Sequence, residues 1–335
     1  MIRRAAAILI VIAALASPAA AQERVRVGLT RLASNGGLFL AASQGYFQAE
    51  GLDVELRAFA SANQVAQALA AGAVNFGVTR FNAASLNLAG RGAIKAIAAQ
   101  ARERRGYDGN AVVASNAAYA HGLRKLSDLA NKVVAISALG STMHYQLGQI
   151  ARLNGFALDG ITLKPLQTPD AIARAVEDDK VDAAILPAQY ARDLLTASQG
   201  KFLGWYAELD EQQLGALFAT SAMIATRRAT VEKFVRAYRR GVADYAATLL
   251  RRSRSGKRVF DGKAEVAATL IAAYIYPDRS NAARAVAASA YFVEPRARID
   301  VSDIARQIAW YKAQGLVSKD ADARAAVDLS FTAGP

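Results

Sequence analysis

The chain has 335 residues, 53% of them hydrophobic, with no cysteine and a formal net charge of +13 at pH 7. The absence of cysteine excludes disulfides, thiolate metal sites, cysteine nucleophiles and an acylated-cysteine anchor, so stability must come from a packed core. The basic residues are spread along the chain apart from one dense run at 251–258, which is typical of a solvated loop and not of a nucleic-acid site.

The N-terminus has the pattern of an export signal. Basic residues at positions 3 and 4 precede an apolar run at 5–16, which is too short to span a bilayer. Small residues then offer a cleavage site that ends at Ala21. We expect a signal peptide over 1–21, cleavage after Ala21, and a periplasmic protein that is not a lipoprotein. No later segment approaches the roughly 20 apolar residues that a membrane span needs.

Short apolar strands alternate with helical segments over the first part of the mature chain. The predicted strands lie at 25–29, 52–59, 76–78 and 94–98. The predicted helices lie at 63–70 and 82–89, and a glycine closes each of them. This order predicts a parallel or mixed sheet that helices cover on both faces.

A second set of elements follows. Its predicted strands lie at 112–114, 133–136, 162–166, 183–186 and 202–206, and its helices at 143–154, 169–178 and 188–198. The remaining chain holds one last predicted strand at 217–225 and then only helices, at 230–253, 263–274, 280–288 and 302–314. Two α/β units followed by a helical tail predict a protein of two lobes.

Two short motifs follow the first predicted strand: Gly-Tyr-Phe at 45–47 and Glu-Gly-Leu-Asp-Val-Glu-Leu at 50–56. They resemble the opening of the periplasmic solute-binding proteins of the nitrate, sulfonate and taurine type, a family that also includes thiamine-precursor binders. The Gly-Ser-Thr at 140–142 with a histidine after it, the Val-Asp-Ala at 181–183 and the helix at 230–245 are also similar to that family.

This resemblance implies an α/β fold of two lobes, the type II periplasmic binding protein fold. Each lobe would be a mixed sheet flanked by helices, and a helical tail would end the chain. The first lobe would be discontinuous, at 22–108 and 219–335, and the second would span 109–218. The hinge crossings between them are expected near 101–112 and 214–221.

A ligand is expected at the strand-to-helix loops. Ligands of open α/β sheets bind beyond the carboxyl ends of the strands, where free N–H groups at helix N-termini favour anions. The candidate ligand-binding residues on these loops are Asn35, Gly36, Gly37, Ser61, Asn63, Thr79, Arg80, Phe81, Gly140, Ser141, Thr142, His144, Pro187, Gln189 and Tyr190.

Two loops carry the most specific chemistry. Arg80 directly follows a buried strand, so it either holds an acidic solute with its planar fork or forms a salt bridge on the lobe surface. Ser141 or Thr142 is expected to cap a helix and to offer its hydroxyl to an anionic group. The two glycines at 36 and 37 would let a ligand approach the backbone.

Two loop residues have plain structural alternatives. His144 is either a packed residue of the first helical turn or a ligand contact. We expect no metal site, because the only other histidine is His121 and no metal-binding motif is present. Pro187 suits the first turn of a helix without any role in binding.

The leading function is that of a receptor for a small anionic solute such as a sulfonate, a carboxylate or an oxyanion. The resemblance implies that two lobes close on the solute and dock on an ABC permease in the inner membrane. We expect a monomer without a cofactor. No enzyme is expected, because no G-x-x-x-x-G-K-[ST] or G-x-S-x-G motif occurs.

Two alternatives stay open, and one related enzyme is disfavoured. The thiamine-precursor branch of the resemblance would bind a pyrimidine instead of an acid. One enzyme of that branch carries a cysteine-rich motif, and this chain has no cysteine. A receptor that presents its solute to a membrane sensor would have the same sequence features as one that serves a permease.

Overall fold

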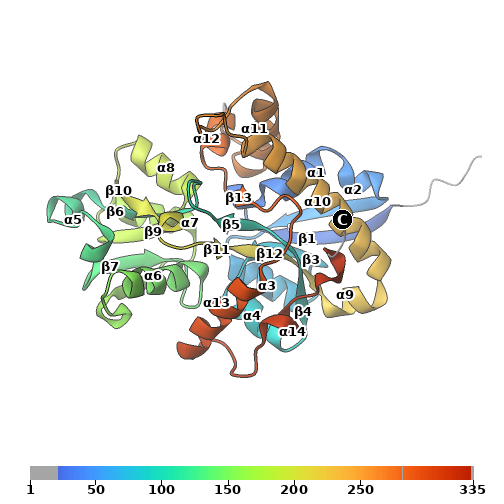
Figure 1. Ribbon diagram of the computed structural model, residues 1–335, viewed down its shortest axis with the longest axis horizontal. Coiled ribbons are helices and arrows are strands. Elements are labelled where there is room, and N and C mark those ends of the chain that lie inside the picture. Colours follow the sequence, from blue (N-terminus) through green and yellow to red (C-terminus); the bar gives the residue numbers. More distant parts are fainter. Residues whose placement is uncertain (1–21, 281, 333–335) are drawn as a thin grey trace, which may run out of the picture.

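The structure is a computed structural model that describes residues 22–280 and 282–332. The expected signal peptide therefore lies outside the described residues. Two five-stranded sheets lie side by side along the long axis of the molecule, and a small third sheet lies between them (Figure 1). Helices flank both large sheets. The fold class predicted from the sequence, two α/β units with mixed sheets and a helical C-terminal region, is confirmed.

The first sheet is mixed. Its strands in spatial order are β2 (Leu52–Ala58), β1 (Glu23–Leu29), β3 (Phe76–Arg80), β12 (Gly215–Thr220) and β4 (Ile94–Ala99). Strand β1 runs parallel to β2 and β3, whereas β12 is antiparallel to β3 and β4. One apolar core lies on each face, because the strands are buried on both sides.

Different helices cover the two faces of this sheet. One face packs against α1 (Gly36–Ser43), α2 (Tyr46–Ala49), α10 (Arg228–Leu249), α11 (Gly262–Ile275) and α12 (Ala283–Ala288). The other face packs against α3 (Ala62–Ala70), α4 (Ala83–Gly90), α13 (Val301–Ala313) and α14 (Ala323–Ala326). The helical tail therefore contributes to both cores of the first sheet.

The second sheet is built from one continuous part of the chain. Its strands in spatial order are β10 (Lys201–Trp205), β6 (Asn110–Ala114), β9 (Ala183–Pro187), β7 (Val133–Ile136) and β8 (Thr162–Pro165). Its helices are α5 (Asn116–Ala120), α6 (Thr142–Leu153), α7 (Pro169–Glu177) and α8 (Ala188–Thr196). Strand β6 is antiparallel to both of its neighbours, so this sheet is mixed as well.

The third sheet contains both crossings between the large sheets. Its order is β11 (Gln212–Gln213), β5 (Ala101–Glu103) and β13 (Phe292–Val293), all antiparallel. Strand β5 takes the chain toward the second sheet and β11 brings it back. Strand β12 then pairs within the first sheet. Residues 215–218, which the expected boundary places in the second lobe, are therefore part of the first sheet.

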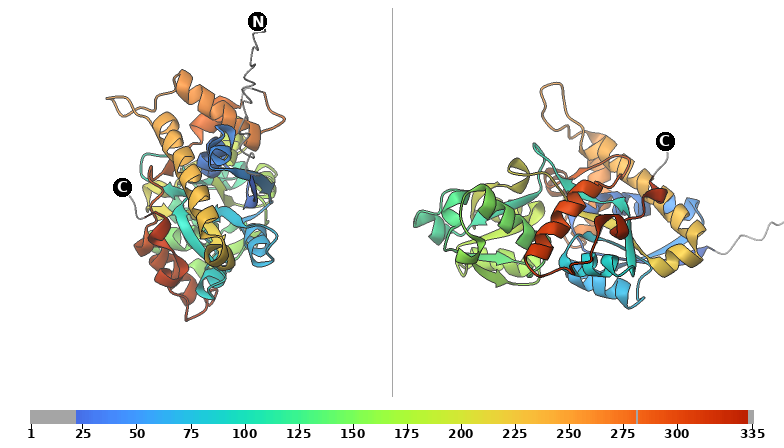
Figure 2. Two further views of the ribbon diagram at one scale, coloured as in Figure 1. Left: turned by 90° about the vertical axis from the view of Figure 1, so that its right-hand side faces the viewer. Right: turned by 60° about the horizontal axis from the view of Figure 1, so that its bottom comes forward.

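The predicted strand at 217–225 is wrong in its second half. The strand ends at Thr220, whose Oγ1 accepts a hydrogen bond from Met223 N at 3.2 Å and caps the helix α9 (Ser221–Thr226). The threonine cap stops the strand, although the apolar residues that follow it favour continuation. The helix expected to extend to 253 ends at Leu249, and the basic run at 251–258 forms an exposed loop that projects from the molecule (Figure 2).

The motif at 45–56 has a structural explanation. Gly45 and Gly51 have φ of 70° and 75°, a left-handed conformation that glycine adopts without steric cost. Between them, Phe47 is fully buried and stacks on Phe234 of α10 with ring centroids 4.7 Å apart. The motif thus turns the chain twice and anchors α2 before β2 begins.

Helices α1 and α10 approach so closely that only glycine fits at their contact. A Cβ on Gly36 would lie 2.3 Å from Tyr245 Cε2, and one on Gly37 would lie 2.8 Å from Val242 Cγ2. From the other helix, a Cβ on Gly241 would lie 2.2 Å from the Gly37 carbonyl oxygen. The two glycines expected at a ligand therefore lie against α10.

Gly241→Val should lower the free energy of unfolding by about 3 kcal/mol, because the added carbons meet backbone atoms that cannot move aside. Urea denaturation of the mature protein measures this loss. Gly262→Val is the matched control, since no atom lies within 4 Å of a Cβ built there. Equal stabilities of the two variants would contradict the close contact.

Candidate functional site

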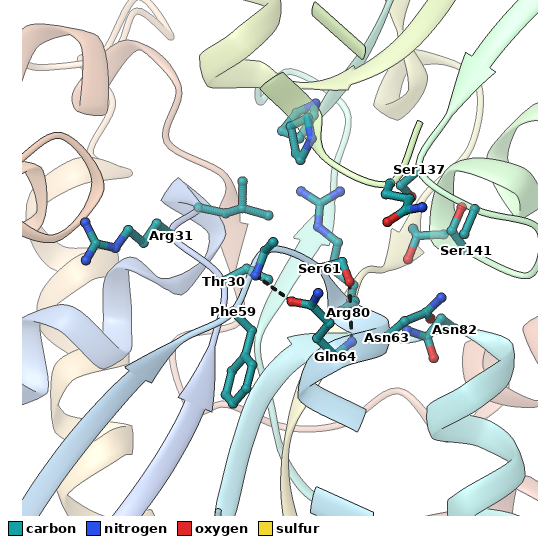
Figure 3. Close-up of a pocket in the computed structure, with 18 of the residues that line it drawn as sticks. Thr30, Arg31, Phe59, Ser61, Asn63, Gln64, Arg80, Asn82, Ser137 and Ser141 are labelled. Carbon is teal, nitrogen blue, oxygen red and sulfur yellow. Dashed lines mark hydrogen bonds between the residues drawn. The ribbon is translucent and has the colours of Figure 1, made fainter. Parts of the chain in front are cut away.

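A cavity of about 690 Å³ lies between the two large sheets. This volume is within the range of about 300–1,000 Å³ found for small-molecule sites. Its walls come from both sheets: segments around 30–32, 58–64 and 80–82 face segments around 137–143 and 167–170. Figure 3 shows Ser61, Arg80 and Asn82 from the first sheet near Ser137 and Ser141 from the second.

The carboxyl ends of six strands meet at this cavity. Strands β1, β2 and β3 end there on one side, and β7, β8 and β9 end there on the other. Helices α3, α4, α6 and α7 begin close to the same cavity, and each has a side-chain cap. Their positive ends and remaining free N–H groups make the cavity favourable for negative charge.

The caps fix the loops that form the walls. Ser61 Oγ accepts from Gln64 N at 3.3 Å, and Ala60 N donates to Gln64 Oε1 at 3.0 Å; both bonds are drawn in Figure 3. Ser141 Oγ accepts from His144 N at 3.2 Å. The predicted capping role of Ser61 and Ser141 is therefore confirmed.

The structure brings seven of the candidate residues to the cavity wall. They are Ser61, Asn63, Arg80, Ser141, Thr142, Pro187 and Tyr190. Three of them come from the first sheet and four from the second, so a solute in the cavity would contact both. Tyr190 also donates from its hydroxyl to Asp170 Oδ2 at 3.2 Å, which positions both side chains at the wall.

The first-sheet candidates that do not line the cavity are used in packing. Gly36 and Gly37 lie against α10. Asn35 donates from Nδ2 to Thr30 O at 2.6 Å and accepts from Gln100 Nε2. Thr79 is buried within β3, and the ring of Phe81 packs edge-on against Phe218 with centroids 5.5 Å apart.

Three second-sheet candidates do not line the cavity either. Gly140 forms a left-handed turn with φ of 74°, and its carbonyl accepts from Ala83 N at 2.8 Å. His144 Nδ1 accepts from Gly140 N at 3.1 Å, its ring lies against Trp310, and burial lowers its pKa. Gln189 Oε1 accepts from Ala33 N at 2.8 Å.

Sequence reasoning missed several polar residues of the wall. They are Arg31, Gln64, Gln67, Asn82, Ser137, Gln167 and Asp170. Asn82 is the most informative, because it is 1% exposed and its Nδ2 has no hydrogen-bond partner within the described residues. Its Oδ1 caps α4 by accepting from Ser85 N at 2.7 Å. In the sequence, Asn82 lies at the start of a predicted helix directly after a buried strand, and this position could have identified it as a candidate.

Arg80 is buried, with 6% of its surface exposed. Its Nη1 donates to Asn110 Oδ1 at 2.9 Å and its Nη2 to the Tyr291 hydroxyl at 3.1 Å. Its Nε has no partner within the described residues. The surface salt bridge that the sequence left open does not form, since no acidic group of the described chain lies within 4.0 Å of the guanidinium.

Direct hydrogen bonds join the two sides of the cavity. Thr142 Oγ1 donates to Phe81 O at 2.6 Å, and Tyr311 OH donates to Ser141 O at 2.9 Å. On the opposite side, an ion pair joins Arg279 to Asp193 at 3.1 Å. Helix α13 lies against α6, where a Cβ on Gly148 would be 2.5 Å from the Trp310 ring (Figure 2). The two sides are thus in close contact.

Two further observations concern metals and membranes. Within residues 22–280 and 282–332, no group of three or more His, Asp or Glu side chains is placed to hold a metal ion. Over the same residues, no helix combines the length and the apolar character needed to cross a bilayer.

Known proteins share this fold across almost the whole chain. The alkanesulfonate-binding protein SsuA from Xanthomonas axonopodis pv. citri, bound to MOPS, matches with a TM-score of 0.71 and 18% identity, covering 93% of this chain and 100% of that one. The periplasmic aliphatic sulphonate binding protein SsuA from Escherichia coli matches with a TM-score of 0.70 and 16% identity, covering 91% and 97%.

An enzyme has the same fold. The desulfurization enzyme DSZB matches with a TM-score of 0.62 and 13% identity, covering 92% of this chain and 98% of that one. At these identities the matches show the fold alone. No curated protein matches the chain in sequence.

The family model described as "NMT1/THI5 like" matches residues 33–248. This segment contains all of the first-sheet strands except β1 and all of the second sheet, together with every polar residue named above at the cavity wall except Arg31. The match covers well over half of the chain, and the fold is that of periplasmic binding proteins. The chain therefore belongs to the NMT1/THI5-like family.

Proposed function

We propose that this protein is a periplasmic receptor that binds a small anionic organic solute in the cavity between its sheets and delivers it to an ABC permease of the inner membrane. The observation that carries the proposal is a pair of buried donors at the cavity wall. Asn82 Nδ2 and Arg80 Nε both lack partners within the described residues. Buried donors are costly to leave unpaired, so a ligand that accepts hydrogen bonds would stabilise them.

The shape and lining of the cavity support an organic solute over a bare oxyanion. A volume of about 690 Å³ exceeds what a small oxyanion would fill. Apolar side chains of Leu32, Phe59, Met143 and Ile275 share the wall with the polar groups. A solute with an acidic head and an apolar body would satisfy both parts of the lining.

The proposed motion is closure of two lobes on the solute. The first lobe comprises 22–108 and the C-terminal part of the chain, and the second begins at 109. We place the return boundary at Gly215, because β12 pairs with β3 and β4. A solute that contacts both lobes only in the closed arrangement would shift the population toward that form.

Binding is favoured over catalysis by the residues at the cavity. The chain has no cysteine, and neither histidine is among the residues that line the cavity wall. Two of the serines there, Ser61 and Ser141, accept hydrogen bonds as helix caps. Among the described residues of the wall, the serines are accompanied by no histidine, so the usual pair of nucleophile and base is absent there.

A neutral pyrimidine-like solute is the second candidate. Carboxamide side chains of Asn63, Gln64, Gln67 and Gln167 line the cavity, and each offers both a donor and an acceptor. A thermal-shift screen of the mature protein separates the two classes with sulfonates, carboxylates, aromatic acids, oxyanions and pyrimidines. A ligand at about 100 times its Kd should add roughly 2.7 kcal/mol of stability. A response to pyrimidines alone would contradict the anionic solute.

Asn82→Asp should weaken binding of an anionic solute by about 10- to 100-fold, because it replaces the unpaired N–H donor with a negative oxygen. The new side chain keeps an oxygen to cap α4, which preserves the start of that helix. Isothermal titration with the best acid of the screen measures the affinity.

Thr220→Asp is the matched control for this change. It adds the same charge at the N-cap of α9, which is not part of the cavity wall. Its affinity should stay within about twofold of the unmodified protein, since Thr220 is only half-buried and a charge away from the cavity is screened by salt. Equal losses in both variants would show a general charge effect and remove Asn82 from the site.

Gly148→Val should lower solute affinity by roughly tenfold, because the added carbons would collide with Trp310 and oppose close contact of the two lobes. Small-angle scattering with saturating solute should show a larger radius of gyration than for the unmodified protein. Adding Trp310→Ala to the same chain should restore affinity, since it removes the collision. A double variant as weak as the single one would contradict this explanation.

A further inference from the structure

A buried polar network lies directly behind Arg80. Asn110, the first residue of β6, is fully buried and accepts at Oδ1 from both Arg80 Nη1 at 2.9 Å and the Tyr291 hydroxyl at 3.1 Å. Its Nδ2 donates to Gln146 Oε1 at 2.6 Å on α6. The guanidinium at the cavity wall is thus held by a residue of the second sheet, although Arg80 itself ends a strand of the first.

Glu103 on β5 completes this network. It is fully buried, and its Oε1 accepts from Asn110 N at 2.9 Å and from Gln146 Nε2 at 3.1 Å. Its Oε2 has no partner within the described residues and faces Gly109, where a Cβ would lie 1.6 Å away. Only glycine leaves room for the carboxyl group at that position.

Gln146 lies on α6, a helix whose start forms part of the cavity wall, and its side chain bonds to both crossing strands. Its Nε2 donates to Glu103 Oε1 on β5 and also to Gln212 Oε1 on β11, at 3.0 Å. The same helix, α6, begins with Ser141 and Thr142 at the cavity. Hydrogen bonds therefore connect Arg80, both crossing strands and the opposite wall of the cavity.

We infer that Glu103 and Asn110 are positioning residues that hold the Arg80 guanidinium at the cavity. Through them, the affinity for an anionic solute depends on the ionisation of the Glu103 carboxyl group on the crossing strand β5. This inference rests on the proposed function for its effect on affinity, but the coupling of Glu103 to Arg80 does not require a solute. Neither residue lines the cavity, so both would act through Arg80.

Burial raises the pKa of Glu103 to about 7, while the hydrogen bond from Asn110 N and the charge of Arg80 oppose the rise. The other ionisable groups that face Glu103 are Asp108 of the crossing loop, whose charge adds to the rise, and the hydroxyls of Tyr206 and Tyr291. Its hydrogen-bond donors, Asn110 N and Gln146 Nε2, are neutral amides. Glu103 is therefore the group of this network that changes charge near neutral pH.

The direction in which affinity changes with pH follows from the linkage between proton binding and solute binding. Above about pH 7 the ionised Glu103 offsets the charge of Arg80, and below it the neutral acid leaves that charge available to a solute. Affinity for an anion should therefore fall as pH rises through 7. A shift of one unit in the pKa of Glu103 on binding corresponds to a change in affinity of about tenfold. Because the folded pKa exceeds the unfolded value of 4.5, stability should also fall as pH rises from about 4.5 to about 7 and should change little above that.

The test that needs no solute is side-chain ¹⁵N NMR of the mature protein between pH 5 and 9. The Arg80 Nε signal, assigned by its loss in Arg80→Lys, should shift in one step with a midpoint near pH 7. Glu103→Gln keeps an oxygen for Asn110 N and Gln146 and should abolish the step. Glu55→Gln, which removes an exposed partner of Arg57, should leave it unchanged. A flat profile, or a step that persists in Glu103→Gln, would overturn the inference.

The same coupling can be measured in the unmodified protein alone. The ¹³C signal of the Glu103 carboxyl group should titrate with the same midpoint as Arg80 Nε. Midpoints that differ by more than about one unit would overturn the coupling, so the result does not depend on whether Glu103→Gln folds.

The solute test uses benzenesulfonate, which keeps its charge over the whole pH range. Its Kd, from isothermal titration, should rise by about tenfold between pH 6 and 8 in the unmodified protein and by less than about twofold in Glu103→Gln. An equal rise in both proteins would overturn the role of Glu103 in affinity. If benzenesulfonate binds neither protein, the proposed sulfonate-type solute loses support, and the NMR comparison alone still decides the coupling.

Discussion

The two strands that connect the sheets place polar side chains in the interior, where a hydrogen-bonding group is costly to leave unpaired. Glu103 and Gln212 lie on these strands and are fully buried. The single carboxamide of Gln146 bonds to both. An unpaired buried group would cost a large part of the stability of a domain, so this pairing fixes where the crossings lie and how α6 is oriented. The wall of the cavity at Ser141 and Thr142 follows from that orientation.

The fold could be predicted from the sequence because each element carries a local signal. Apolar runs such as 133–136 become buried strands, and caps such as Ser61 start helices where the pattern places them. The prediction was wrong where two local signals compete. At Thr220 an apolar run continues past a good capping residue, and the cap ends the strand. The small third sheet gave no signal, because strands of two or three residues have no periodicity.

The candidate site was harder to predict, because a loop position does not say which way a side chain points. Asn35, Phe81 and His144 are on the expected loops, yet their side chains bond or pack within the protein. Phe81 was an expected ligand contact in its loop, but the next residue, Asn82, lines the cavity instead. The sequence placed Arg80 after a buried strand, but its partners Asn110 and Tyr291 are distant in the chain and could come only from the fold.

The position of β12 in the first sheet has a consequence for the order in which the chain folds during synthesis. This strand lies between β3 and β4, which do not pair with each other, so the first sheet stays incomplete until the chain has emerged past Thr220. The second sheet uses only residues 110–205 and closes without any segment from outside that range. A chain synthesised from its N-terminus can therefore complete its middle unit before its first one. The apolar faces of β1 and β3 would need shielding from aggregation during that interval.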